Sequence, residues 1–299
     1  MSGLLLTGAG GFTGRHLAPR LAAAGHEVHG LAHSLSDEMP DGVHHVHQAN
    51  LADPVALANV IAEVKPAYVV HLAAIAFVAH GNAEEMYRTN LIGTRHLLEA
   101  LATSGGDVSM VLLASSANIY GNAREGALDE EVPPSPANDY GVSKLAMEFV
   151  ARLYADRLPI AVVRPFNYTG VGQSENFLIP KIVAHAKRRA PSIELGNIDV
   201  ARDFSDVRSV AEIYTRMLAE PKVVGGTFNV CSGRAITLRE VVSDVEDLTA
   251  QSMDVQVNPA FVRANEVRTL SGSPALLESM IGPLPRIPFR DTLDWMLSA

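Results

Sequence analysis

Residues 4–14 read LLLTGAGGFTG, an apolar run followed by a glycine-rich turn and the start of a helical pattern. The apolar run predicts a buried strand, and the residues after it predict a helix. Glycine lets the backbone turn tightly and approach a ligand, and the N–H groups at a helix N-terminus attract anions. We therefore expect this segment to hold the pyrophosphate of a dinucleotide. The residues expected there are Gly8, Gly11, Phe12, Thr13 and Gly14.

Apolar runs alternate with helical patterns through the first half of the chain. The expected strands are Gly3–Thr7, Glu27–Ala32, Val43–Val46, Ala67–Leu72, Ser109–Ala114 and Pro159–Arg164, and the expected helices are Thr13–Ala24, Pro54–Val64, Asn82–Thr103 and Asp139–Asp156. This alternation predicts an α/β fold with a Rossmann-like, doubly wound parallel sheet. Ligands bind such sheets at the carboxyl ends of the strands, so Gly8, Ser116 and Asn167 should meet there.

The second half of the chain is less regular and predicts a smaller C-terminal substrate lobe. Its expected helices are Phe177–Arg188, Val207–Ala219, Leu238–Leu248 and Arg290–Leu297, and Thr227–Val230 reads as a strand returning to the sheet. We expect a dinucleotide-binding domain over residues 1–166, joined by 205–232. Residues 167–299 then form the interleaved substrate-binding lobe.

Composition excludes several classes of partner. The chain has 299 residues, a net charge of −9 and one cysteine, Cys231. No apolar run approaches the roughly 18–20 residues of a membrane span. An acidic chain is poorly suited to nucleic acid, and a single cysteine suits a reducing compartment. We expect a cytoplasmic protein with no secretion signal, no membrane span and no nucleic-acid partner.

Residues 140–144 read YGVSK and place a phenol and an ammonium one helical turn apart. A free phenol has a pKa of about 10. The positive charges of Lys144 and a nicotinamide should lower the pKa of Tyr140 toward neutrality. Together with the glycine turn, the pair predicts hydride transfer between a nicotinamide and a carbon that bears oxygen. Tyr140 would handle the proton and Lys144 would bind the nicotinamide ribose.

The spacing Gly-x-x-Gly-x-x-Gly, followed by Tyr-x-x-x-Lys, resembles the extended branch of the short-chain dehydrogenase/reductase superfamily. The resemblance implies that Ser116, four residues before Tyr120, polarises the substrate oxygen. It also implies that Leu72, Ala73 and Ala74 flank the cofactor. Asn90, on the following helix, would contact the cofactor region and support a proton relay.

The end of the second strand reads GLAHS at residues 30–34, without an acidic residue. An acid at this place usually binds the ribose hydroxyls of NAD. Arg15 stands beside the glycine turn, and His33 is placed to face a 2′-phosphate. We expect NADP(H) to be preferred, with NAD(H) as the alternative.

Several later segments resemble nucleotide-sugar enzymes, and in their order they resemble the GDP-4-keto-6-deoxy-D-mannose reductases. The implied substrate-binding residues are Ser116, Asn167, Gly196, Arg202, Arg263 and Glu266. The implied reaction is reduction of the 4-keto group of a GDP-linked, or other nucleotide-linked, 4-keto-6-deoxyhexose, giving GDP-D-rhamnose in that group. Two arginines suit a diphosphate, because guanidinium pairs bidentately with its oxygens.

Some features leave the substrate open. Arg202 could instead pair with Asp203 or Asp206, and Arg263 with Glu266. Tyr168 stands where that group usually has histidine, and Val171 where it has proline.

Three other functions use the same fold. A nucleotide-sugar 4-epimerase needs only the triad and a tightly held NAD. A 4,6-dehydratase would carry glutamate at position 118, where this chain has Asn118. A non-catalytic NADP-binding regulator should lack Tyr140 or Lys144. The resemblance also implies a homodimer that forms through helices 82–103 and 139–156.

Histidines 44, 45 and 47 could suggest a metal site. Neighbouring side chains of a strand point to opposite faces, and this run contains no acid or cysteine. We therefore expect a polar strand end and no metal.

Overall fold

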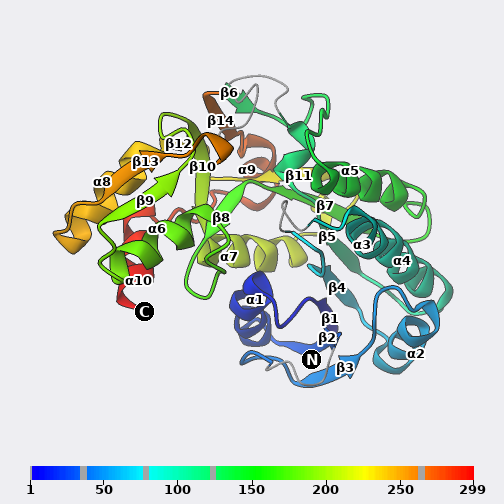
Figure 1. Ribbon diagram of the computed structural model, residues 1–299. Helices are drawn as coiled ribbons and strands as arrows, with labels where there is room; N and C mark the ends of the chain where they lie inside the picture. Colours follow the sequence, from blue (N-terminus) through cyan, green and yellow to red (C-terminus); the bar gives the residue numbers. More distant parts are fainter. Residues whose placement is uncertain (1, 34–38, 77–80, 122–125, 262–266) are drawn as a thin grey trace.

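A computed structural model describes residues 2–33, 39–76, 81–121, 126–261 and 267–299. Its main feature is a seven-stranded, fully parallel sheet in the order β3-β2-β1-β4-β5-β7-β11 (Figure 1). The strands are β1 (Ser2–Thr7), β2 (His26–Ala32), β3 (His45–Gln48), β4 (Tyr68–His71), β5 (Met110–Ala114), β7 (Ile160–Pro165) and β11 (Thr227–Val230). The order reverses between β1 and β4, as in a doubly wound sheet. The predicted α/β fold is confirmed.

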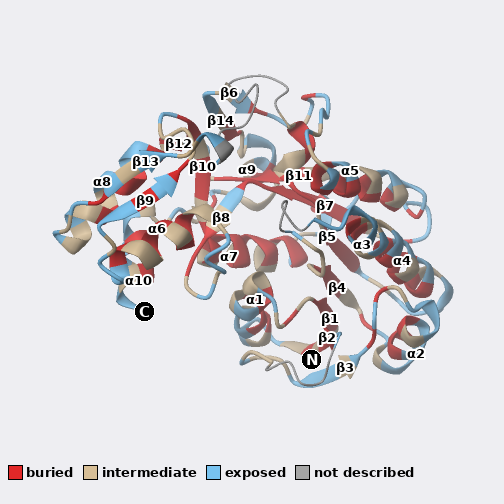
Figure 2. Ribbon diagram, in the orientation of Figure 1, coloured by how far each residue is buried: buried red, intermediate tan, exposed pale blue. Residues whose placement is uncertain are grey.

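Helices cover both faces of this sheet (Figure 1). One face carries α1 (Phe12–Ala23) and α7 (Val207–Leu218), and the other carries α2 (Pro54–Val64), α4 (Thr94–Thr103) and α5 (Asp139–Arg152). Side chains alternate along β1, so Leu4 and Leu6 join the α1–α7 core while Leu5 joins the opposite one. All three are fully buried, which explains the unbroken apolar run (Figure 2).

The helix expected over residues 82–103 is not α-helical throughout. The segment runs through α3 (Ala83–Tyr87), a π-helical stretch η1 (Arg88–Gly93) and then α4. π-helical turns inside helices occur frequently at functional sites. Other boundaries differ from the sequence prediction by up to four residues: β3 runs over His45–Gln48 rather than Val43–Val46, and α5 ends at Arg152 rather than Asp156.

The remaining elements form a smaller layer beside the carboxyl edge of the sheet. Strand β10 (Ala201–Asp206) pairs with β8 (Asn167–Thr169), β12 (Ala235–Thr237) and β14 (Thr269–Gly272), and β14 pairs with β6 (Gly126–Leu128). A second small sheet joins β9 (Ser192–Leu195) to β13 (Asp254–Val257). Helices α6 (Leu178–Lys187), α8 (Leu238–Thr249) and α10 (Phe289–Ser298) share one apolar core, centred on Ile182, Val241 and Leu293.

The two parts exchange segments. Strand β6, from the first half of the chain, completes the small sheet, while α9 (Ala275–Ile281) buries Leu277 in the core under β1. The short helices η2 (Ala117–Tyr120), η3 (Pro221–Val223) and η4 (Pro259–Phe261) complete the structure. Among the described residues, no helix combines the length and apolarity needed to cross a membrane.

Candidate active site

The glycine turn joins β1 to α1 at the switch point of the sheet. Gly8 has a φ of +71°, and a Cβ there would lie 2.9 Å from the backbone N of Ala73. Only glycine suits both constraints. The Gly11 N–H donates to the Gly8 carbonyl at 3.0 Å, and Gly11 caps α1 without a side chain. The first turn of α1, with Phe12, Thr13 and Gly14, therefore presents backbone N–H groups in a cradle that suits a pyrophosphate.

A buried hydrogen-bond chain fixes the segment after β4, which was predicted to flank the cofactor. The Thr94 hydroxyl donates to the Asn90 carbonyl at 2.7 Å, so it accepts from His71 Nε2–H at 2.9 Å. His71 Nδ1 then accepts from the Thr7 hydroxyl at 2.7 Å, and that hydroxyl accepts from the Ala73 N–H at 3.2 Å. Burial lowers the pKa of His71 to about 3, which keeps the ring neutral.

Asn90 lies in the π-helical stretch and is completely buried. Its Oδ1 accepts from the Ile75 N–H at 2.8 Å, and its Nδ2 donates to the Ile75 carbonyl and to Ser143 Oγ, both at 3.0 Å. Ser143 in turn donates to the carbonyl of Tyr140 at 2.8 Å. Asn90 thus ties the segment after β4 to the first turn of α5. Its contact with a cofactor stays a prediction.

Helix α5 brings Tyr140 to Ser116. A Cβ on Gly141 would lie 2.6 Å from the Asn118 carbonyl oxygen, so glycine lets α5 press directly against η2. Ser116 caps η2 and accepts from the backbone N–H and the Nδ2 of Asn118, both at 3.1 Å. Tyr140 is 9% exposed, and Ser116 lies close enough to lower the pKa of its phenol, against the effect of burial. The structure therefore places the two predicted catalytic hydroxyls together.

Among the chain's own residues, the expected lowering of the Tyr140 pKa by Lys144 is absent. Burial, and after it the neighbouring Tyr168, raise the pKa of Tyr140, and Ser116 only partly opposes them. The Lys144 ammonium donates instead to the Ala114 carbonyl at 2.7 Å. A phenol with a raised pKa holds its proton at neutral pH, so Tyr140 is protonated in this structure.

Lys144 is 3% exposed, and burial lowers the pKa of its ammonium to about 8, with Glu148 opposing the shift. Glu148 lies one turn further along α5 and forms a bidentate ion pair with Arg164, at 3.0 and 2.8 Å. The Ser115 hydroxyl donates to the same carboxylate at 2.6 Å, and Arg164 also donates to the hydroxyl of Tyr120 at 2.9 Å. Sequence reasoning missed this network, because residues far apart in sequence form it.

The two residues expected at a 2′-phosphate lie at the ends of neighbouring elements. Arg15 is exposed in the first turns of α1, and its Nε donates to the Gly10 carbonyl at 2.9 Å. His33 is exposed just after β2 and lies 3.2 Å from Asn50 Nδ2 through its Nε2.

The predicted substrate residues lie in the smaller layer. Asn167 is exposed at the start of β8 and donates to the Asp203 carbonyl at 3.3 Å. Gly196 follows β9, and a Cβ there would lie 2.7 Å from the Phe261 carbonyl. Arg202 donates to the carbonyls of Ala201 at 2.9 Å and Arg268 at 3.3 Å. Arg263 and Glu266 lie outside the described residues.

The acids considered as partners of Arg202 have other contacts. Asp203 accepts from the backbone N–H groups of Ser232, Gly233 and Gly272 at 2.9 to 3.2 Å, while Asp206 forms a bidentate pair with Arg208.

Tyr168 connects the two regions, and the sequence analysis noted it only as a departure from a family pattern. Its hydroxyl lies 2.7 Å from Thr13 Oγ1, and its ring stacks on Phe12 with centroids 6.0 Å apart. His16 Nε2 lies 2.9 Å from the carbonyl of Val171, two residues after β8. The first turns of α1 therefore hold the loop that leads into the smaller layer.

The geometry of the site agrees with a family comparison. Residues 5–296 match the family described as GDP-mannose 4,6 dehydratase. The chain belongs to this family. The resemblance to nucleotide-sugar short-chain dehydrogenases/reductases is thereby confirmed.

Two relatives of this chain carry more specific names. The GDP-6-deoxy-D-mannose reductase of Pseudomonas aeruginosa is 34% identical, over 99% of this chain and 96% of its own. The GDP-6-deoxy-D-talose 4-dehydrogenase of Aggregatibacter actinomycetemcomitans is 32% identical, over 93% of this chain and 91% of its own.

Solved structures agree with the fold across the whole chain. A Burkholderia cenocepacia J2315 protein provisionally designated an epimerase has 48% identity and a TM-score of 0.93, covering 99% of this chain and 97% of its own. RMD from Pseudomonas aeruginosa, complexed with NADPH, has 33% identity and a TM-score of 0.87, covering 100% and 98%. MoeE5 in complex with UDP-glucose and NAD has 28% identity and a TM-score of 0.87, covering 99% and 97%.

Proposed function

We propose that this chain reduces the 4-keto group of a GDP-linked 4-keto-6-deoxyhexose, with GDP-4-keto-6-deoxy-D-mannose as substrate and GDP-D-rhamnose as product. The observation that carries the proposal is the close approach of α5 to η2 at Gly141, which brings Tyr140 near Ser116. The names of the reductase and 4-dehydrogenase relatives support oxidation or reduction at C4 of a GDP-deoxysugar.

Each residue of the site has a distinct role in this proposal. NAD(P)H, when bound, supplies the hydride. The Tyr140 phenol, whose pKa is raised by burial, keeps the proton that the new alkoxide needs. Ser116 donates to the substrate oxygen, and such preorganised donors stabilise developing negative charge. Lys144 would bind the nicotinamide ribose.

We propose NADP(H) as the preferred cofactor, through Arg15 and His33, with NAD(H) as the alternative. The NADPH complex of the RMD neighbour supports the first choice and the NAD complex of MoeE5 the second. Leu72, Ala73, Ala74 and Asn90 would line this site. Asn167, Gly196, Arg202, Arg263 and Glu266 would bind the nucleotide sugar, from a lobe over residues 167–299 that returns to the first domain through 205–232.

We propose a cytoplasmic homodimer. Four apolar side chains on or beside the helices expected at the interface are exposed to solvent, and burial against a second copy would remove them from water. They are Ile92, Val142, Phe149 and Leu153.

A single assay tests the reaction. The protein is incubated with GDP-4-keto-6-deoxymannose and NADPH, and the hexose is identified by NMR while NADPH consumption is followed. We expect one NADPH consumed per sugar reduced. Interconversion of two sugars without net oxidation, with NAD retained through purification, would instead favour the 4-epimerase. The designation of the Burkholderia cenocepacia neighbour keeps this second candidate open.

A substitution tests the role of the phenol. Tyr140→Phe should lower turnover by about 10²- to 10⁴-fold, the usual contribution of a positioned proton donor, while cofactor affinity is kept. Tyr154→Phe is the matched control, because the Tyr154 hydroxyl donates to Glu99 and not to the site. Near-normal turnover in Tyr140→Phe would remove Tyr140 as the proton donor.

A further inference from the structure

The exposed edge of the large sheet carries a cluster of side chains that the proposed reaction does not use. Strands β2 and β3 pair in parallel, with His29 opposite His45 and Leu31 opposite His47. Because alternate residues of a strand share a face, Glu27, His29, His45 and His47 lie on one side of this edge. The sequence analysis found no acid near the histidine run, since Glu27 and His29 come from the neighbouring strand. The expectation that no acidic residue accompanies the histidines was wrong, because the Glu27 carboxylate lies beside His45.

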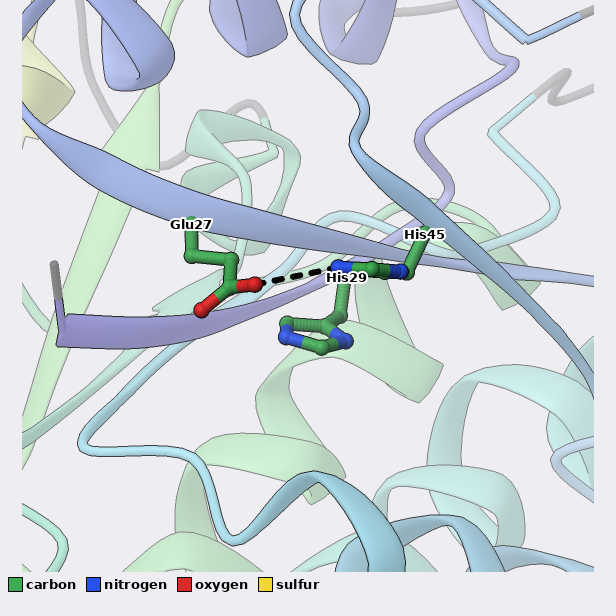
Figure 3. A group of neighbouring side chains, drawn as sticks. All are labelled: Glu27, His29 and His45. Carbon is green, nitrogen blue, oxygen red and sulfur yellow. Dashed lines mark hydrogen bonds and ion pairs between the residues drawn. The ribbon is translucent and has the colours of Figure 1, made fainter.

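We propose that Glu27, His29 and His45 bind one first-row divalent cation of the Zn²⁺ type. Each residue offers one ligand atom, and the three atoms lie within 4.8 Å of one another (Figure 3). The Glu27 carboxylate already lies 3.0 Å from His45 Nε2. Nitrogen ligands of a tetrahedral zinc ion stand about 3.3 Å apart, given Zn–N distances of roughly 2.0–2.1 Å. A rotation of these side chains, of which His45 is exposed and Glu27 and His29 are half-buried, would bring the three ligand atoms together around one ion.

The surrounding residues orient the central ligand. His29 Nδ1 lies 3.0 Å from His47 Nε2, so His29 Nε2 remains for an ion. His47 Nδ1 in turn lies 3.8 Å from a carboxylate oxygen of Glu63, on α2. Histidines that bind metal commonly give their other ring nitrogen to such a partner, which fixes the orientation of the ring. The rings of His29 and His45 also stack, with centroids 4.7 Å apart.

The donor set selects the kind of ion. Two imidazoles and one carboxylate suit Zn²⁺, Ni²⁺ or Cu²⁺, whereas Mg²⁺ and Ca²⁺ prefer oxygen ligands. Three protein ligands leave a fourth position for water. His29 stands four residues before His33, about 13 Å along the strand, so the ion would lie away from the proposed hydride transfer. Its effect would be to join the short edge strand β3 to β2.

Calorimetric titration with Zn²⁺ tests the proposal on the full chain, freed of any affinity tag and stripped with a chelator. We expect one equivalent bound, a higher Tm with Zn²⁺ because an ion that binds the folded state stabilises it, and unchanged turnover. His29→Gln and His45→Gln should each weaken binding at least tenfold and abolish the rise in Tm. His185→Gln, which changes a histidine on α6, should leave both unchanged.

Two outcomes would overturn the proposal. One is an absence of Zn²⁺ binding up to millimolar concentration. The other is equal binding by the wild type, His29→Gln and His45→Gln, which would place the ion on other histidines. If a histidine variant does not fold, Glu27→Gln removes the carboxylate ligand from an exposed position and must still weaken binding.

Discussion

Replacing Gly141 by alanine should separate the two hydroxyls of the candidate active site without unfolding the protein. The new Cβ would lie 2.6 Å from the Asn118 carbonyl oxygen, so α5 must withdraw by about 0.8 Å to reach ordinary contact at 3.4 Å. That movement carries Tyr140 away from Ser116. A misplacement of about 1 Å in an active site can cost about 10²-fold, so we expect turnover to fall about 10- to 100-fold.

The stability of Gly141→Ala should change much less than its turnover. Overpacking costs about 1–3 kcal/mol, while replacing a helical glycine by alanine returns up to about 1 kcal/mol. The assay compares kcat for reduction and Tm with those of Gly106→Ala, where a Cβ meets only Ser104 Oγ at 3.5 Å. A wild-type kcat in Gly141→Ala would refute the idea that this contact sets the catalytic geometry.

Two further predictions concern the charges behind the site. The pKa of Lys144 is lowered to about 8, so its ammonium is charged below that pH. Turnover should therefore fall as the pH rises through 8, which a pH–rate profile measures. A flat profile up to pH 9.5 would contradict this prediction. Glu148→Gln removes the charge that raises the pKa of Lys144, so the alkaline limb of the pH–rate profile should move to lower pH. It also leaves Arg164 buried without its carboxylate partner, so the free energy of unfolding measured with denaturant should fall by about 3–5 kcal/mol. Arg157→Gln, which changes an exposed arginine paired with Glu99, is the control, and an unmoved alkaline limb in Glu148→Gln would disprove the coupling.

Most strands of the central sheet were predictable because they are buried. Apolar runs such as Leu4–Leu6, flanked by helical patterns, indicate strands of a parallel sheet that is covered on both faces. The short strands β6 and β8 were not predictable. They have three residues each, and their partners β14 and β10 lie 30 or more residues away in the sequence.

The site was predictable where one local segment carries the chemistry. The glycine turn and Tyr140–Lys144 are such segments. The direction of the Tyr140 pKa shift was not predictable from the sequence, because it depends on burial and on which carbonyl Lys144 contacts. The Glu27–His45 contact was also hidden, since it arises only when β2 and β3 pair.

The contact of Tyr168 with Phe12 and Thr13 has a kinetic consequence. The start of α1, proposed to bind the dinucleotide, and strand β8, proposed to bind the nucleotide sugar, are held in contact by these residues. Release of either ligand would then disturb the residues that bind the other. Such a coupling favours a compulsory order of addition and release, with the nucleotide sugar entering a site that the dinucleotide has already shaped.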